Sequence, residues 1–234
     1  MGNRKYIPAT RLLFLSCLAI LIMTNSIGCT SGKASSDKGA KLLAAAARND
    51  TTAIRQLLKE GVNIECRDNN GRTPLMVATY QNHLAAARLL MASGADVNAQ
   101  DHMRNSPFLY AGASGYLDIV KLCLQHHANF KVLNRYGGTA LIPAAEKGHV
   151  EVVNLLAHTK GFPIDHINNL GWTALLEAVL LSDGGPKHQQ IVQLLVDAGC
   201  NVNIADRDGI TPLQHARKKG YTQMVNILEK AGAK

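Results

Sequence analysis

The chain has 234 residues, a hydrophobic fraction of 47% and a formal net charge of +8. This apolar content is typical of a folded protein and excludes a disordered or collagen-like chain. The charge excess is modest, and no run of Lys and Arg alternates with aromatic residues, so a nucleic-acid partner is not expected.

Residues 1–28 have the pattern of an export signal. Arg4, Lys5 and Arg11 make a basic start, and residues 12–23 form an apolar core that is short for a membrane-spanning helix. Residues 26–29 read Ser-Ile-Gly-Cys, which resembles the lipobox of bacterial lipoproteins, where a small residue precedes the cysteine that is lipidated. The lipobox prefers Leu where this chain has Ser26, and the same residues also fit ordinary signal cleavage.

Three interpretations of this leader therefore stay open: a lipoprotein anchored through Cys29, a soluble secreted protein, and an uncleaved anchor. The lipoprotein resemblance implies a fatty acyl group such as palmitate on Cys29, followed by a polar, flexible tether over residues 29–36. Because Thr30 is not Asp, it also implies an outer-membrane position facing the periplasm.

One structural unit recurs along the rest of the chain, and residues 69–102 show it most clearly. Asn70 and Gly71 predict a tight turn, and Thr73 and Pro74 are suited to the N-cap and first position of a short helix. A second apolar stripe at helical spacing follows and ends at a glycine. Neither helix can bury its apolar side alone, so the unit requires neighbouring copies.

The copies are present, because helix starts recur at intervals of 33, 33, 34 and 38 residues, at Thr73, Ser106, Thr139, Thr173 and Thr211. This period resembles the ankyrin repeat, and so do Thr-Pro-Leu at 73–75 and 211–213, Gly-His at 148–149 and Gly-Ala-Asp-Val-Asn at 94–98. The resemblance implies an all-α ankyrin-repeat helical solenoid of about six repeats with degenerate terminal caps. The expected domain covers residues 37–234, with repeats at 37–68, 69–102, 103–135, 136–169, 170–207 and 208–234.

The chain departs from the family pattern at several positions. The histidine of the family's Thr-Pro-Leu-His motif is replaced throughout, by Met76, Leu109, Ile142, Leu176 and Gln214. Arg104 stands where the other turns have Gly, which predicts a different backbone geometry or strain. Residues 182–187 are an insertion between two helices. Leu89 and Leu155 are expected in the core, whereas Leu181 is expected outside it.

No residues are arranged for catalysis or metal binding. Cys66 and Cys200 lie four repeats apart, which is about 40 Å of stacked helices and too far for a disulfide. Cys123 is expected in the core, so the three cysteines beyond Cys29 are interpreted as free structural thiols. The nine histidines lack ligand spacing, and no motif for nucleophilic, metal-dependent or phosphate chemistry occurs. We therefore expect neither enzyme activity nor a cofactor.

The family resemblance implies binding through the turn tips and the inner side of each first helix. Carried over by position, the expected partner-binding residues are Tyr80, Met103, Arg135, Tyr136, Leu170, Trp172, Leu180 and Leu181. Trp172 and Tyr136 are the expected anchors, since Trp, Tyr and Arg supply most hot spots at interfaces.

The resulting interpretation is a non-catalytic protein–protein interaction scaffold, an ankyrin-repeat lipoprotein of the bacterial cell envelope. The partner is expected to be a protein, with no small-molecule substrate. One alternative is an inhibitor or immunity-type protein that blocks a partner enzyme. Another is a metal- or redox-responsive envelope protein that uses its His and Cys residues.

Overall fold

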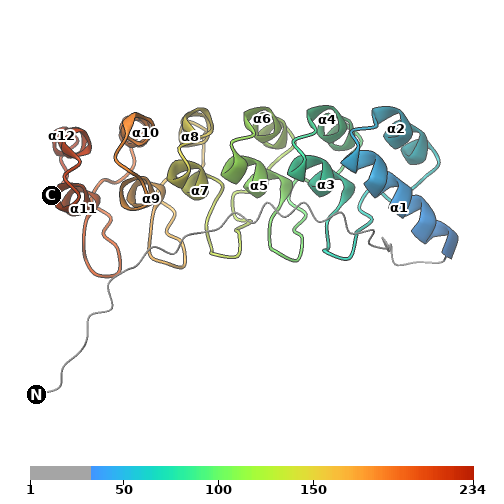
Figure 1. Cartoon of the computed structure of the whole chain (residues 1–234), viewed down its shortest axis with the longest axis horizontal. Helices are drawn as coiled ribbons and strands as arrows, with labels where there is room; N and C mark the ends of the chain where they lie inside the picture. The colour runs from blue at the N-terminus through green and yellow to red at the C-terminus, as the bar shows by residue number, and fades with distance from the viewer. Residues whose placement is uncertain (1–32) are drawn as a thin grey trace, which may run out of the picture.

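The structure is a computed structural model that describes residues 33–234, with side chains from Asp37 onward. The predicted leader and Cys29 lie outside this range. Within it the chain is all-helical, and the helices stand in two rows along an elongated molecule (Figure 1). The prediction of an all-α solenoid is confirmed. No helix between residues 33 and 234 is long and apolar enough to cross a membrane.

Each predicted repeat has two helices, although the first helix of the chain begins at Lys33, before the expected start of its repeat at residue 37. The odd-numbered helices form one row beside the loops and the even-numbered helices form the other (Figure 1). The bounds are α1 Lys33–Ala47, α2 Thr51–Lys59, α3 Pro74–Tyr80, α4 Leu84–Ala92, α5 Pro107–Ser114, α6 Leu117–Gln125, α7 Leu141–Glu146, α8 Val150–Ala157, α9 Ala174–Leu180, α10 Pro186–Asp197, α11 Pro212–Lys218 and α12 Thr222–Lys230.

Two boundaries differ from the expected ones. Helix α1 begins at Lys33, inside the segment 29–36 that we predicted to be a flexible tether. Helix α10 begins at Pro186, so the end of the insertion lengthens this helix to 12 residues. Proline suits the first turn of a helix because the N–H that it lacks has no partner there.

In each repeat from residue 69 onward, the sequence predicts that a Thr or Ser side chain caps the first helix. The structure confirms this cap in four of these five repeats. The hydroxyl oxygens of Thr73, Ser106, Thr173 and Thr211 each accept a hydrogen bond of 3.1–3.3 Å from the backbone N–H three residues later. Thr139 was predicted to do the same, and this is wrong. Ala140 takes the cap position of α7 instead, and the buried Oγ1 of Thr139 has no partner in the described part of the chain. Pro143, four residues later, has no N–H for the carbonyl of Thr139.

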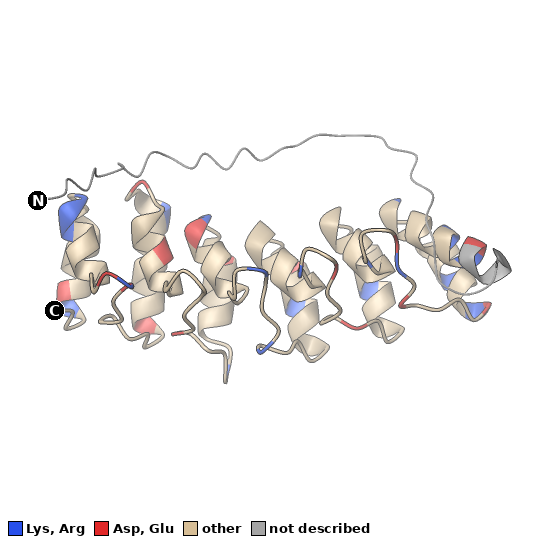
Figure 2. Ribbon diagram, turned by 90° about the horizontal axis from the view of Figure 1, so that it is seen from below, with Lys and Arg blue, Asp and Glu red and all other residues tan. Residues whose placement is uncertain are grey.

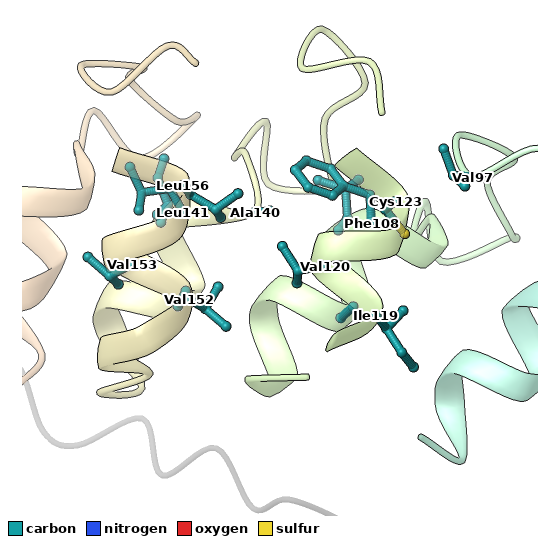
Figure 3. Close-up of a cluster of buried hydrophobic side chains, with 14 of the residues drawn as sticks. Val97, Phe108, Ile119, Val120, Cys123, Ala140, Leu141, Val152, Val153 and Leu156 are labelled. Atoms are coloured by element: carbon teal, nitrogen blue, oxygen red, sulfur yellow. The ribbon is translucent and has the colours of Figure 1, made fainter. Parts of the chain in front are cut away.

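A continuous apolar core runs between the two rows, and Figure 3 shows its middle part. One equivalent position on the second helix of the repeat is fully buried in the five repeats from residue 69 onward, and it is occupied by Leu90, Cys123, Leu156, Leu195 and Leu228. The core position of Cys123 is thus confirmed. Leu89 and Leu155 were predicted for the core, but each precedes the buried position by one residue, which turns it by about 100° on the helix. Both are only half-buried.

Hydrogen bonds from aromatic side chains join successive repeats. His83 Nε2 lies 3.1 Å from the carbonyl oxygen of Ala47, and His188 Nε2 lies 2.9 Å from that of Glu146. In the last repeat Tyr221 donates its hydroxyl proton to the carbonyl of Ser182 at 2.7 Å. Ala47 and Glu146 are the last residues of α1 and α7, so their carbonyls have no partner within their own helices, whereas Ser182 lies two residues beyond the end of α9.

The core positions give a test of stability. Replacing Leu156 with Ala should lower the free energy of unfolding by about 2–5 kcal/mol, because its side chain is fully buried. Leu155→Ala should cost less than half as much, and Leu181→Ala, at an exposed site, less again. Urea unfolding followed by circular dichroism measures all three. Equal losses for Leu155 and Leu156 would contradict this assignment of the core.

Candidate interaction surface

Each loop between repeats is closed by one Asp or Asn side chain. Its Oδ1 accepts hydrogen bonds of 2.9–3.0 Å from the backbone N–H groups two and four residues later. The residues are Asp68, Asp101, Asn134, Asn168 and Asp206. Because Asp and Asn can bond their own backbone in this way, they favour tight turns. The tip of each loop is therefore held in a defined conformation.

In each loop, the third residue after the closing Asp or Asn has a left-handed backbone conformation. Glycine occupies this position in four loops, whereas Arg104 occupies it in the third repeat with φ 58°. The predicted departure at Arg104 is thus confirmed as a strained conformation, because a residue with a Cβ seldom has a positive φ.

Three of the expected binding residues meet at neighbouring tips. The guanidinium of Arg135 lies 4.8 Å from the ring centroid of Tyr136, within the range of a cation–π contact. The same group lies 4.0 Å from the sulfur of Met103, in the preceding loop. Met103 is 49% exposed and Tyr136 is 43% exposed. An apolar pair with a basic group between them therefore faces solvent.

Leu170 and Trp172 lie in the next loop. The backbone N–H of Asn169 donates to the carbonyl of Tyr136 at 2.9 Å, so this loop is tied directly to the preceding one. Leu170 is 49% exposed, whereas Trp172 is half-buried. Leu170 thus extends the exposed row, and the role of Trp172 as an anchor stays a prediction.

Tyr80 is a brace between repeats. Its hydroxyl donates to Asp101 Oδ2 at 2.6 Å and accepts from Asn105 Nδ2 at 2.9 Å. Its ring centroid lies 4.2 Å from that of Tyr110. Burial, reinforced by the bond to Asp101, raises the pKa of its phenol. Its polar end is already bonded within the fold, and its contact with a partner stays a prediction.

Leu180 and Leu181 lie apart from the tips. They stand at the far end of α9, a helix about 10 Å long that begins two residues after Trp172. Leu180 is half-buried and Leu181 is exposed. The expected residues therefore form two groups, a row along the loop tips and a smaller one at the far end of α9.

Sequence reasoning missed two exposed apolar features. Ile167, just before the closing Asn168, is 50% exposed. A shallow depression opens between α2 and α4 with a partly basic rim, lined by Arg55, Leu58, Lys59, Val62, Ile64, Leu89 and Ser93. Neither feature falls at a position that the family uses for binding, so the repeat pattern gives no signal for them.

The described part of the chain contains both possible metal ligands and cysteine thiols. Between residues 37 and 234 no group of three or more His, Cys, Asp or Glu could hold a metal ion. Burial raises the pKa of Cys123 and of Cys200 to about 12, which leaves little thiolate at neutral pH.

A family model described as ankyrin repeats in three copies matches residues 12–101, 108–206 and 160–234. The chain belongs to the ankyrin repeat family. Ankyrin repeat domains are generally scaffolds for protein–protein interaction and generally have no catalytic activity. Their stacked repeats present extended surfaces to partners.

Solved ankyrin structures agree with this assignment. A crystal structure of an ankyrin repeat domain from Acinetobacter baumannii AYE has a TM-score of 0.80 and 55% identity, over 82% of this chain and 98% of that one. The ankyrin repeat protein EF0377 has a TM-score of 0.79 and 41% identity, with 82% and 98% covered. The ankyrin repeat protein YahD of Escherichia coli K12 is 47% identical over 79 residues, which are 34% of this chain and 39% of YahD. The chain thus matches about two fifths of the length of YahD.

The buried carboxyl group of Glu177 predicts that the free energy of unfolding depends on pH. Glu177 on α9 is nearly fully buried, and its Oε1 accepts a 2.8 Å hydrogen bond from Asn168 Nδ2. Burial raises the pKa of Glu177 to about 7, with a further contribution from the charge of Glu146. In the unfolded chain the carboxyl would titrate near its ordinary value of 4.5.

The folded protein therefore binds more protons than the unfolded chain between about pH 4.5 and pH 7. Its free energy of unfolding should fall as the pH rises through this window, by up to about 3 kcal/mol. Glu177→Gln should remove this loss, so that the variant is more stable than the parent at pH 8 and similar at pH 4.5. Urea unfolding across this pH range measures the difference, and parallel curves for the two proteins would refute the prediction.

Proposed function

We propose that this protein is an envelope-anchored ankyrin scaffold that binds a protein partner through its loop tips and has no activity of its own. The observation that supports the proposal best is the exposed row of Met103, Tyr136 and Leu170, with Arg135 stacked on Tyr136. Exposed apolar side chains beside polar ones resemble the centre and rim of protein interfaces.

The rigidity of the loops supports binding at this row. Each tip is closed by two hydrogen bonds to one side chain, and backbone bonds also join two pairs of adjacent tips, His102 to Asn70 and Asn169 to Tyr136. A surface that is ordered before the partner arrives loses little conformational freedom on binding. More of the contact energy then contributes to affinity.

The envelope position rests on the sequence of the leader. We propose that residues 1–28 are removed, that Cys29 carries the lipid, and that the repeats face the periplasm from the outer membrane. The basic start, the short apolar core and the Gly-Cys pair at 28–29 support this proposal.

The inhibitor alternative shares the same surface and differs only in the partner. If the partner is an enzyme that loses activity on binding, the protein acts as an inhibitor. The redox alternative has less support, because the high pKa of Cys123 and Cys200 makes them poor nucleophiles at neutral pH.

A first experiment tests the binding surface. Tyr136→Ala should weaken the complex with a partner captured from envelope extracts by about 2 kcal/mol, because anchor side chains supply most interface energy. Trp172→Ala should do the same if the half-buried indole reaches the partner. Lys121→Ala, at an exposed site on the outer helix α6, is the control and should bind normally. If Trp172→Ala lowers the melting temperature and leaves affinity intact, Trp172 is a packing residue.

A second experiment tests the anchor. Cys29→Ala should move the protein from the membrane fraction to the soluble fraction, because the cysteine thiol would be the site of acylation. Fractionation and immunoblotting measure the distribution, and Cys123→Ala provides a matched control within the core. An unchanged membrane fraction for Cys29→Ala would contradict lipidation.

A further inference from the structure

The exposed apolar row has a fixed register along the molecule. Met103, Tyr136 and Leu170 occupy the same position in three consecutive loops, two residues after the closing Asp or Asn. The equivalent positions in the first and last loops are Asn70 and Asp208, which are polar. The row is therefore three side chains long and ends within the solenoid.

The spacing of the row follows from the stacking of the helices. Packed helices lie about 8–10 Å apart, so successive tips advance by roughly this distance. Direct backbone bonds hold two pairs of neighbouring loops together: the N–H of His102 donates to Asn70 at 3.0 Å, and that of Asn169 to Tyr136 at 2.9 Å. The outer two side chains are thus about 16–20 Å apart.

The charge beside the first two tips of the row is positive. Arg104 and Arg135 are exposed there, and no salt bridge joins them to another residue of the described range. Arg207 lies in the last loop, where its guanidinium donates to the carbonyl of Asn169 and exposed Asp208 stands next to it in the chain. The neighbouring acidic groups of Asp101 and Asp206 are bonded within the fold, to Tyr80 and to His215. Figure 2 looks onto this side and shows both Lys and Arg segments and Asp and Glu segments on the loops.

We propose that the partner segment that binds this row is an acidic stretch in the polyproline II conformation with an apolar side chain at every third residue. The proposal rests on the proposed function and adds the conformation and charge of the bound segment. A polyproline II helix has three residues per turn and rises 3.1 Å per residue, so its equivalent side chains recur about every 9 Å. Three such side chains match the three tips one to one.

Other extended and helical segments fit this register less well. A β-strand repeats its side-chain direction about every 6.7 Å, which loses register with the tips within one interval. In an α-helix, side chains seven residues apart point the same way and lie about 10.5 Å apart. The apolar stripe of such a helix also has a side chain three or four residues along, about midway between them. Those side chains would lie over polar groups such as Arg135. The acidic residues of the proposed segment would instead pair with the arginines.

Fluorescence anisotropy with labelled 12-residue peptides and the full chain tests the proposal. The probes are a Glu-Pro-Leu repeat, a Lys-Pro-Leu repeat, an alternating Glu-Leu peptide and a Glu-rich helix with Leu in heptad spacing. The Glu-Pro-Leu repeat should bind about tenfold more tightly than each of the others, and Tyr136→Ser should remove about tenfold of that affinity. Ile167→Ser is the control, because Ile167 is equally exposed and lies outside the row; it should bind as the parent does.

Equal binding of the alternating or heptad peptide would overturn the proposal, and so would an equal loss on Ile167→Ser. Absence of binding by the Glu-Pro-Leu repeat would also overturn it. In that case the proposed function stands if Tyr136→Ala still weakens the captured partner, and fails with it if that complex is unaffected. The two experiments therefore separate an error in the bound conformation from an error in the surface.

Discussion

The geometry of the surface depends on one hydrogen-bonding pattern, in which a single Asp or Asn oxygen closes each loop. Asn134 shows the principle, because its Oδ1 binds the N–H groups of Tyr136 and Gly138 and leaves the Tyr136 ring outside. The same side chains also join the loops to other elements, as Asn168 does with Glu177 and Asp206 with His215. The loops are thus extensions of the rigid solenoid.

Sequence alone predicts much of this architecture, because local rules and the repeat period agree. The caps at Thr73 and Ser106 follow from residue type and position, and the strain at Arg104 follows from the glycine that it replaces. The repeat period, however, predicts where each helix lies along the chain more reliably than it predicts which side of the helix a given residue occupies. The sequence placed Leu89 and Leu155 in the core, but the buried residue is the next one along each helix. A shift of one residue is enough to move a side chain from the core to its edge.

The sequence predicted which residues lie at the loop tips better than it predicted the burial and the contacts of their side chains. Met103, Tyr136 and Leu170 were all expected at tips, and the structure exposes them. The hydroxyl bonds of Tyr80 depend on the next repeat, because Asp101 and Asn105 lie there. Such a tertiary effect is invisible to a motif that describes one repeat. The other two differences are local: Leu180 lies away from the loop tips because it ends α9, and Ala140 takes the cap position of α7 in place of Thr139.

The central claim is that the loop tips, and not the outer helices, contact the partner. Site-specific photocrosslinking in the envelope tests it most directly, with a photoreactive phenylalanine analogue placed singly at Met103, Tyr136 or Leu170. Lys121 on α6 and Gln193 on α10 are exposed positions on the outer row and provide the comparison. The account predicts one adduct of the same mass from all three tips and none from the outer helices. Adducts from the outer helices alone would contradict it.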